Sequence, residues 1–222
     1  MENGDVNKFF SSLRLQNSHY PPVCMCKKAA RLVVNERLKG DDCMNFLQYS
    51  TAGKLLCLLL VALFSALVID TTAKIFAVLF DLGGTFFGGY ASLGRYILYL
   101  FSGEVTFPDP NFSQLTPLPG ELYVGLAMHY FVAVMDTAVF FFVTFVILKS
   151  PPRLLVAVVQ MWLFLFMPLL IDMPALGLGW AAADSPIQPI ILLRTFVCHT
   201  SFGIAMFVGL ITFDRLYMSG KR

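Results

Sequence analysis

Long apolar runs dominate the chain from residue 55 onward, and shorter polar or glycine- and proline-rich stretches separate them. Four runs reach or approach the length of about 20 residues that an α-helix needs to cross the hydrocarbon core of a bilayer. None of them alternates strictly between apolar and polar residues, so the pattern predicts helices rather than the strands of a membrane barrel. The four runs are residues 55–80, 122–148, 154–171 and 190–213.

The connection between the first and second runs, residues 81–121, has two parts. The first part, DLGGTFFGGYASLGRYILYLF, is glycine-rich and aromatic. It predicts a short helix near residues 92–101 that lies at the membrane interface or re-enters the membrane. The second part, PDPNFSQLTPLPGE, contains four prolines and predicts irregular backbone. The later connection, residues 172–189, is expected to be a surface loop, with a re-entrant turn as the alternative.

Composition agrees with a membrane protein. Hydrophobic residues make up 57% of the chain and charged residues only 14%, whereas soluble domains carry about 25% charged residues. One soluble core of 222 residues could not hide so much apolar surface. The net charge of +2 is small, and basic residues are not interleaved with aromatic ones, which excludes a nucleic-acid-binding protein. The predicted partner is the lipid bilayer, and the predicted fold is an all-α, integral membrane four-helix bundle.

Basic residues mark the orientation of the predicted spans, because Lys and Arg that flank spans tend to stay in the cytoplasm. Half of the basic residues of the chain, Lys54 among them, precede the first span. Lys149 and Arg153 lie between the second and third spans, and Arg215 follows the fourth. The two remaining connections hold Arg95 and otherwise carry acidic residues. The alternation predicts four spans with both termini in the cytoplasm.

The first 43 residues are polar and mixed in character, and they predict a poorly ordered cytoplasmic tail, with residues 44–222 as the membrane domain. Met44 is an alternative start of the chain. Within the tail, CKKAARLVVNERLK (26–39) is compatible with a basic amphipathic helix on an anionic surface, or with an unstructured segment. An alternative for residues 54–69 is a signal peptide, but the apolar run continues and no small-x-small site precedes Asp70.

Five ionisable residues interrupt the apolar runs: Asp70, Lys74, His129, Arg194 and His199. With a rise of about 1.5 Å per residue, antiparallel spans bring all five to the outer half of the membrane. An isolated charge in lipid costs at least ~2.5 kcal/mol, so we expect these side chains to face inward and satisfy one another as an intramembrane polar cluster. Asp70 and Lys74 are four residues apart and can pair on one helix face.

Three further polar residues lie in the predicted spans or directly at their ends. Asp172 reaches the outer boundary at the end of the third span. Asp136 lies deeper in the second span and is expected to be protonated or bonded to Gln160 of the third span.

Motifs of catalysis and metal binding are missing from the sequence. It has no nucleophile elbow, no HExxH and no acidic motif with metal-ligand spacing, so we expect no catalytic residues, no metal and no cofactor. Cys24, Cys26 and Cys43 fall in the predicted reducing cytoplasm, and Cys57 and Cys198 lie in different spans. This spacing predicts no disulfide framework and no zinc site.

Several short motifs occur in a fixed order: ALVIDTTAKIF (66–76), LGRYILYLFSG (93–103), GLAMHY (125–130), PALGLGWAAADSP (174–186) and RTFVCHTSFGIAMF (194–207). With them the chain resembles an uncharacterised family of bacterial inner-membrane proteins with four predicted spans, defined only as a domain of unknown function. The resemblance covers roughly residues 55–215 and implies the fold and the cell inner (cytoplasmic) membrane, but no chemistry. It marks as motif positions Asp70, Arg95, His129, Tyr130, Arg194 and His199.

Three functions are compatible with this pattern. The leading interpretation is a structural or accessory membrane protein whose polar cluster fixes the packing of the bundle. The second is a small proton-coupled carrier or permease component, expected to be a homo-oligomer because four spans make a narrow bundle; the lack of an internal repeat speaks against it. The third is a lipid-modifying enzyme that uses His129 and His199. The sequence assigns no small-molecule ligand.

Overall fold

The apolar runs fold into four long helices in the computed structural model, which describes residues 49–82 and 88–219. Each helix is long and apolar enough to cross a membrane, so the prediction of four spans is confirmed. The described part of the chain contains no β-strand. With their continuations, the four helical stretches are Thr51–Leu79, Glu121–Ile147, Leu154–Ala175 and Gln188–Tyr217.

Two of these stretches are not regular α-helices throughout. The second consists of α6 (Glu121–Phe141) and the wider π-turn η2 (Phe142–Ile147). The third consists of α7 (Leu154–Leu163), the π-turn η3 (Pro168–Asp172) and the short α8 (Met173–Ala175). Because Pro168 has no backbone N–H, it cannot continue the ladder of α7, and the helix is interrupted just before it.

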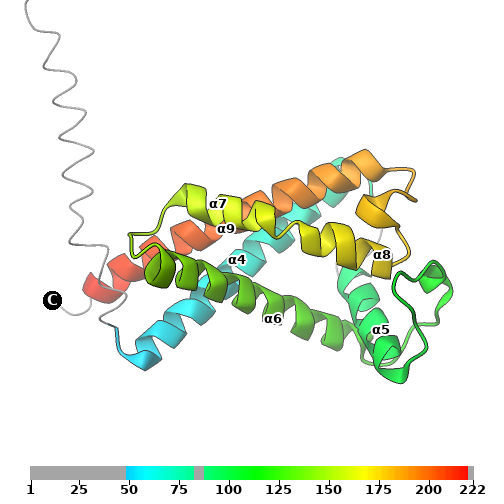
Figure 1. The fold of residues 1–222 in the computed structure, drawn as a ribbon, viewed down its shortest axis with the longest axis horizontal. Helices are drawn as coiled ribbons and strands as arrows, with labels where there is room; N and C mark the ends of the chain where they lie inside the picture. Colours follow the sequence, from blue (N-terminus) through cyan, green and yellow to red (C-terminus); the bar gives the residue numbers. More distant parts are fainter. Residues whose placement is uncertain (1–48, 83–87, 220–222) are drawn as a thin grey trace, which may run out of the picture. The chain divides into compact units, whose positions relative to one another are not determined.

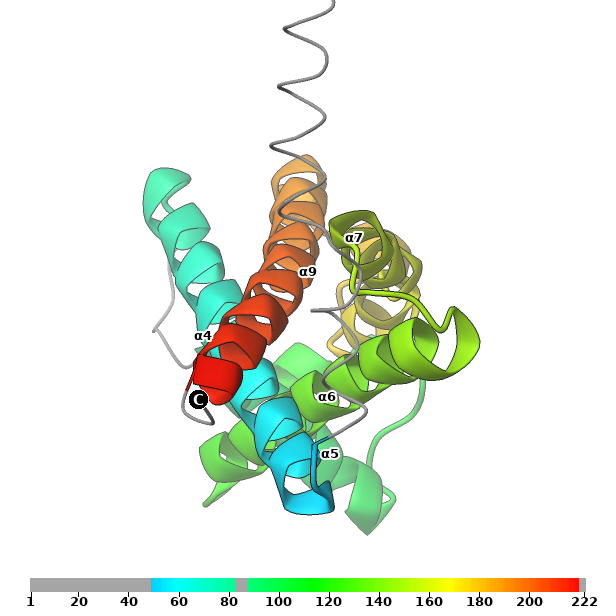
Figure 2. The same cartoon turned by 90° about the vertical axis from the view of Figure 1, so that its left-hand side faces the viewer.

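The helices α4 (Thr51–Leu79) and α9 (Gln188–Ser219) pack against each other along the bundle. Helix α7 packs on α9, and α6 packs on α4, as Figures 1 and 2 show from two sides. Side chains of all four helices meet in one core, which includes Val61, Phe140, Met161 and Met206. At the end where the chain enters α4, Tyr49 donates a hydrogen bond to Asp214 of α9.

A fifth helix, α5 (Gly88–Ser102), lies against α6 at the opposite end of the bundle. It starts four residues earlier than the predicted range of 92–101, at a glycine that the sequence pattern treats as a break. The two helices touch through their backbones. A Cβ atom on Gly94 would lie 1.7 Å from the carbonyl oxygen of Glu121, and one on Gly125 would lie 1.8 Å from that of Tyr90.

The two connections at this end pack together. The first, which contains the 3-10 turn η1 (Phe112–Gln114), donates a hydrogen bond from Asp109 N–H to the Pro174 carbonyl oxygen at 3.2 Å. The second contains the 3-10 turn η4 (Trp180–Ala182). Tyr96, Phe112 and Ala175 form a small second core there, so both connections form a folded cover rather than free loops.

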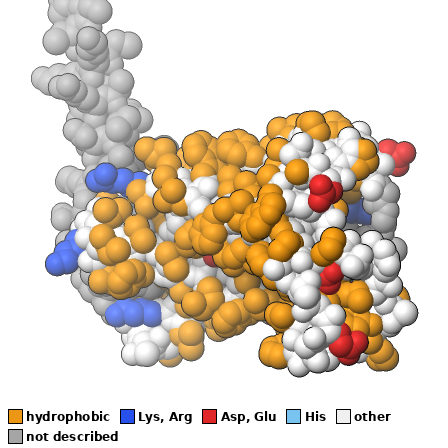
Figure 3. Space-filling view, turned by 45° about the vertical axis from the view of Figure 1, so that its right-hand side comes forward, with side chains coloured by type: hydrophobic (Ala, Val, Ile, Leu, Met, Phe, Trp, Pro, Cys, Tyr) orange, Lys and Arg blue, Asp and Glu red, His pale blue; other side chains and the backbone are white. Residues whose placement is uncertain are grey.

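The surface carries a belt of apolar side chains. In Figure 3, orange side chains dominate the middle of the visible face, Lys and Arg gather toward one end, and most Asp and Glu lie toward the other. This is the arrangement of a protein with its middle in lipid and its ends in water. The predicted tail 1–43, its amphipathic segment 26–39 and the alternative start at Met44 lie outside the described residues.

Replacement of Gly125 by Ala should force α5 away from α6, because the new methyl group meets backbone that cannot give way. We expect the free energy of unfolding to fall by about 3 kcal/mol, at the upper end of overpacking substitutions. Thermal unfolding in detergent measures the change. Gly89→Ala on α5 is the control, because a Cβ atom there meets nothing within 4 Å. Equal melting temperatures for the two variants would contradict the close contact.

Candidate functional site

A cavity of about 480 Å³ opens at the end of the bundle where α4 finishes and α9 begins. Its walls come from α4, α5, α6, α9 and the segment from η3 to the residues after α8. The structure brings six of the ten sequence-predicted polar residues to it. They are Asp70, Lys74, His129, Asp172, Arg194 and His199.

Asp70 is the meeting point of three helices. The Tyr90 hydroxyl of α5 donates a hydrogen bond to Oδ1 of Asp70, and His129 Nε2 of α6 lies 3.0 Å from the same oxygen. The Tyr90 and His129 rings also pack together, with centroids 4.9 Å apart. Asp70 is 12% exposed and His129 22% exposed at the side chain, so this contact is largely shielded from solvent.

His129 is close to Asp70 without a hydrogen bond to it. Its Nε2 atom is buried and makes no hydrogen bond in the described part of the chain, although the distance to Asp70 is short enough. The ring is therefore turned so that Nε2 and the carboxylate are not aligned.

Tyr90 was not among the predicted site residues. Burial, and secondarily the hydrogen bond to Asp70, raise the pKa of the Tyr90 phenol above its usual value. The hydroxyl consequently keeps its proton at neutral pH and acts as a donor. Aromatic residues in a glycine-rich segment are typical of the membrane interface, so the sequence does not distinguish Tyr90 from its aromatic neighbours. Only the orientation of α5 shows that the Tyr90 side chain points toward Asp70.

On the α9 side of the cavity, His199 and Arg194 differ in their bonding. His199 Nδ1 lies 2.8 Å from the Thr195 carbonyl oxygen, so it donates its proton there. Arg194 interacts electrostatically with Tyr90 and Cys198. Among residues 49–82 and 88–219, no ion pair and no hydrogen bond to an oxygen acceptor is found for Arg194.

Asp172 reaches the cavity from the other wall. It is the last residue of the π-turn η3 and lines the cavity together with Pro168. Its carboxylate also makes no ion pair and no side-chain hydrogen bond within the described residues. Lys74 lines the same cavity from α4, and its predicted pairing with Asp70 stays a prediction.

The remaining predicted residues lie outside the lining of the cavity. The Tyr130 ring packs edge-on against His129, with centroids 5.3 Å apart. Gln160 of α7 donates a hydrogen bond of 2.9 Å to the main-chain oxygen of Asp136, not to its carboxylate. The expected link between the second and third spans therefore exists, but it runs through the backbone of Asp136.

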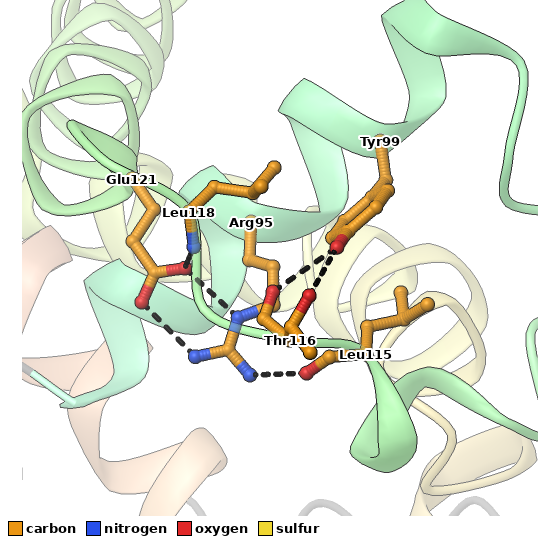
Figure 4. Close-up of polar contacts among 6 residues, drawn as sticks. All are labelled: Arg95, Tyr99, Leu115, Thr116, Leu118 and Glu121. Atoms are coloured by element: carbon orange, nitrogen blue, oxygen red, sulfur yellow. Dashed lines mark hydrogen bonds and ion pairs between the residues drawn. The ribbon is translucent and has the colours of Figure 1, made fainter.

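Arg95 belongs to a second polar centre, which joins α5 to the start of α6 (Figure 4). Its Nε lies 2.8 Å from Glu121 Oε2, and its Nη2 lies 3.0 Å from Oε1. A further bond of 3.1 Å goes to the Leu115 carbonyl oxygen. The hydrogen bond to Glu121 raises the pKa of Arg95 against the opposing effect of burial, so the guanidinium stays charged. Glu121 was predicted only as an acidic residue of a connection.

Within the part of the chain that the structure describes, no three His, Cys, Asp or Glu side chains lie close enough together to hold a metal ion. The cavity instead places ionisable side chains among lining residues that are mostly apolar.

Four apolar helices around such a cavity define a multi-pass membrane protein. Residues 59–212 match the family model described as "Protein of unknown function (DUF2938)", and the chain belongs to this family. The predicted resemblance to an uncharacterised family is thereby confirmed. No curated protein and no solved structure matches the chain.

Removal of one partner of the Arg95–Glu121 pair should destabilise the junction of α5 and α6. The side chains are 17% and 13% exposed, so Glu121→Gln leaves a mostly buried guanidinium without its counter-ion. We expect a loss of about 2–3 kcal/mol of unfolding free energy in thermal melts in detergent. The double variant Arg95→Gln/Glu121→Gln should lose less than the sum of the two single changes; strictly additive losses would contradict the pairing.

Proposed function

We propose that the chain crosses the cell inner membrane with both termini in the cytoplasm and with the cavity open to the outer side. Basic residues at the helix ends away from the cavity support this orientation: Lys54, Lys149, Arg153 and Arg215. The connections at the cavity end instead carry Asp81, Glu104, Asp109 and Asp184. Lys and Arg near spans favour the cytoplasmic side.

In this orientation the protein binds a small polar solute in the cavity and acts as a proton-coupled carrier or permease component. The observation that carries the proposal is the cavity itself, which reaches Asp70 and has ionisable side chains on four of its walls. A polar network that only fixed helix packing would be expected to close on itself, because open polar groups at membrane depth are costly.

Two features suit coupling to protons. Asp70 holds Tyr90 and His129 at one oxygen atom, so a proton on the carboxylate weakens the contacts among α4, α5 and α6. The interruption of α7 before Pro168 lies beside the cavity. Carriers commonly form their binding sites at discontinuous helices, and such a helix can move in two parts.

A structural role is the second candidate, because the Asp70 contacts join three helices and would stabilise the bundle without any transport. The two candidates differ in what a neutral replacement of Asp70 should change. A purely structural cluster affects the melting temperature alone. A carrier requires a measurable flux in the parent protein.

Solvent access to the cavity can be tested with Ala73→Cys in a cysteine-free background. Ala73 lines the cavity, so a membrane-impermeant thiol reagent added outside intact cells should modify it. Ala133→Cys, in the core at 3% exposure, is the control and should stay unmodified. Modification of residue 73 only after the membrane is opened would contradict the proposed orientation, and protection under both conditions would contradict an open cavity.

Coupling can be tested in vesicles that contain the purified protein. A pH gradient should drive proton flux through the parent, and Asp70→Asn should reduce it at least tenfold, since an amide cannot carry the proton. Asp184→Asn, exposed at the same end, is the control. Thermal melts of the same samples separate the two candidates. If Asp70→Asn leaves the proton flux unchanged, the carrier proposal is wrong. If the parent protein shows no flux and Asp70→Asn only lowers the melting temperature, the structural role is favoured.

A further inference from the structure

Two side chains of opposite charge line the cavity and form no ion pair within the described residues. Arg194 comes from the first turns of α9, and Asp172 from the end of η3. Neither forms an ion pair within the described residues, with each other or with another side chain. Both side chains line the same cavity, but they form no ion pair with each other.

The neighbouring groups are already engaged. The Oδ1 atom of Asp70 accepts from Tyr90 and contacts His129, and His199 donates to the backbone of its own helix. Among the charged lining side chains whose contacts are described, Arg194 and Asp172 are the two that form no ion pair and no hydrogen bond to an oxygen atom. A charge at membrane depth is expensive without a counter-ion, so each of the two favours an occupant of opposite charge.

We infer that the cavity binds a solute that carries an anionic group and an ammonium group on one small molecule. The anionic group lies at Arg194, whose planar guanidinium suits the two oxygens of a carboxylate or phosphate. The ammonium group lies at Asp172. The cavity of about 480 Å³ is within the usual range of small-molecule sites. The inference rests on the proposed solute cavity and adds the chemical class of the solute.

The same chemistry has two natural sources. Free amino-acid-like solutes carry it, and so does the phosphoethanolamine headgroup of a membrane lipid. A cavity at the end of the bundle can be reached from water or from the headgroup layer, so the test has one arm for each source.

The first arm uses purified full-length protein, freed of lipid in a maltoside detergent. Calorimetric titration compares β-alanine and phosphoethanolamine with propionate, which lacks the ammonium group, and propylamine, which lacks the anion. We expect at least one of the two doubly charged probes to bind ten times more tightly than either singly charged one. Arg194→Gln and Asp172→Asn should each abolish that advantage. Arg215→Gln, exposed at the other end, should retain it.

The second arm uses nanodiscs with equal amounts of phosphatidylethanolamine and phosphatidylglycerol, and native mass spectrometry counts the lipids that stay bound. A headgroup occupant predicts retained phosphatidylethanolamine, reduced about tenfold by the same two variants. Arg194→Lys serves in both arms if Arg194→Gln does not fold, since it keeps the charge and loses the planar pair of donors.

Dependence on both Arg194 and Asp172 in either arm supports the inference and identifies the source. Propionate binding as tight as that of β-alanine, with no effect of Asp172→Asn, would overturn it in favour of a simple anion site. No dependence in either arm overturns it as well. Doubly charged probes that bind to a protein without proton flux would refute the carrier and leave this inference intact. Proton flux through a protein that does not prefer the doubly charged probes would refute this inference and leave the carrier proposal intact.

Discussion

The backbone contact between α5 and α6 is the constraint on which the polar end of the molecule depends. Lipid gives no hydrophobic force that drives two helices together, so close approach through small residues and polar bonds must hold them. Gly94 and Gly125 permit that approach, and the Tyr90 carbonyl oxygen lies where a Cβ atom of Gly125 would be. The ion pair between Arg95 and Glu121 joins the same two helices, one helical turn before Gly125 on α6. Tyr90 is thereby set in position, and its hydroxyl reaches Asp70 on α4.

Polar groups at this end fall into two kinds, those that bind one another and those that face open space. The Arg95–Glu121 pair and the contacts of Asp70 belong to the first kind. Arg194 and Asp172 belong to the second. The first kind joins α4, α5 and α6, whereas the second lies on α9 and the interrupted third span. The polar bonds at this end therefore join α4, α5 and α6, whereas α9 and the third span are held to the bundle by apolar packing.

The spans could be predicted because long apolar runs leave few alternatives in lipid. Simple antiparallel geometry predicts Asp70, His129 and Arg194 at one level, and all three residues line the cavity. The detailed bonding could not be predicted. Tyr90 touches Asp70 only because α5 begins at Gly88 and packs on Gly125, and a glycine-rich segment does not reveal its helix start or its facing. The hydrogen bond from Gln160 goes to the main-chain oxygen of Asp136. Every residue has such an oxygen, so the identity of residue 136 does not predict this bond.

The lengths of the helices have a consequence for the bilayer itself. Helix α4 has 29 residues and is about 43 Å long, whereas the hydrocarbon layer is about 30 Å thick. A helix longer than this layer either tilts or extends beyond it. Asp70, nineteen residues beyond Thr51, then lies close to the far edge of the hydrocarbon. The thickness of the surrounding lipid therefore bears on how far below the membrane surface this carboxylate lies.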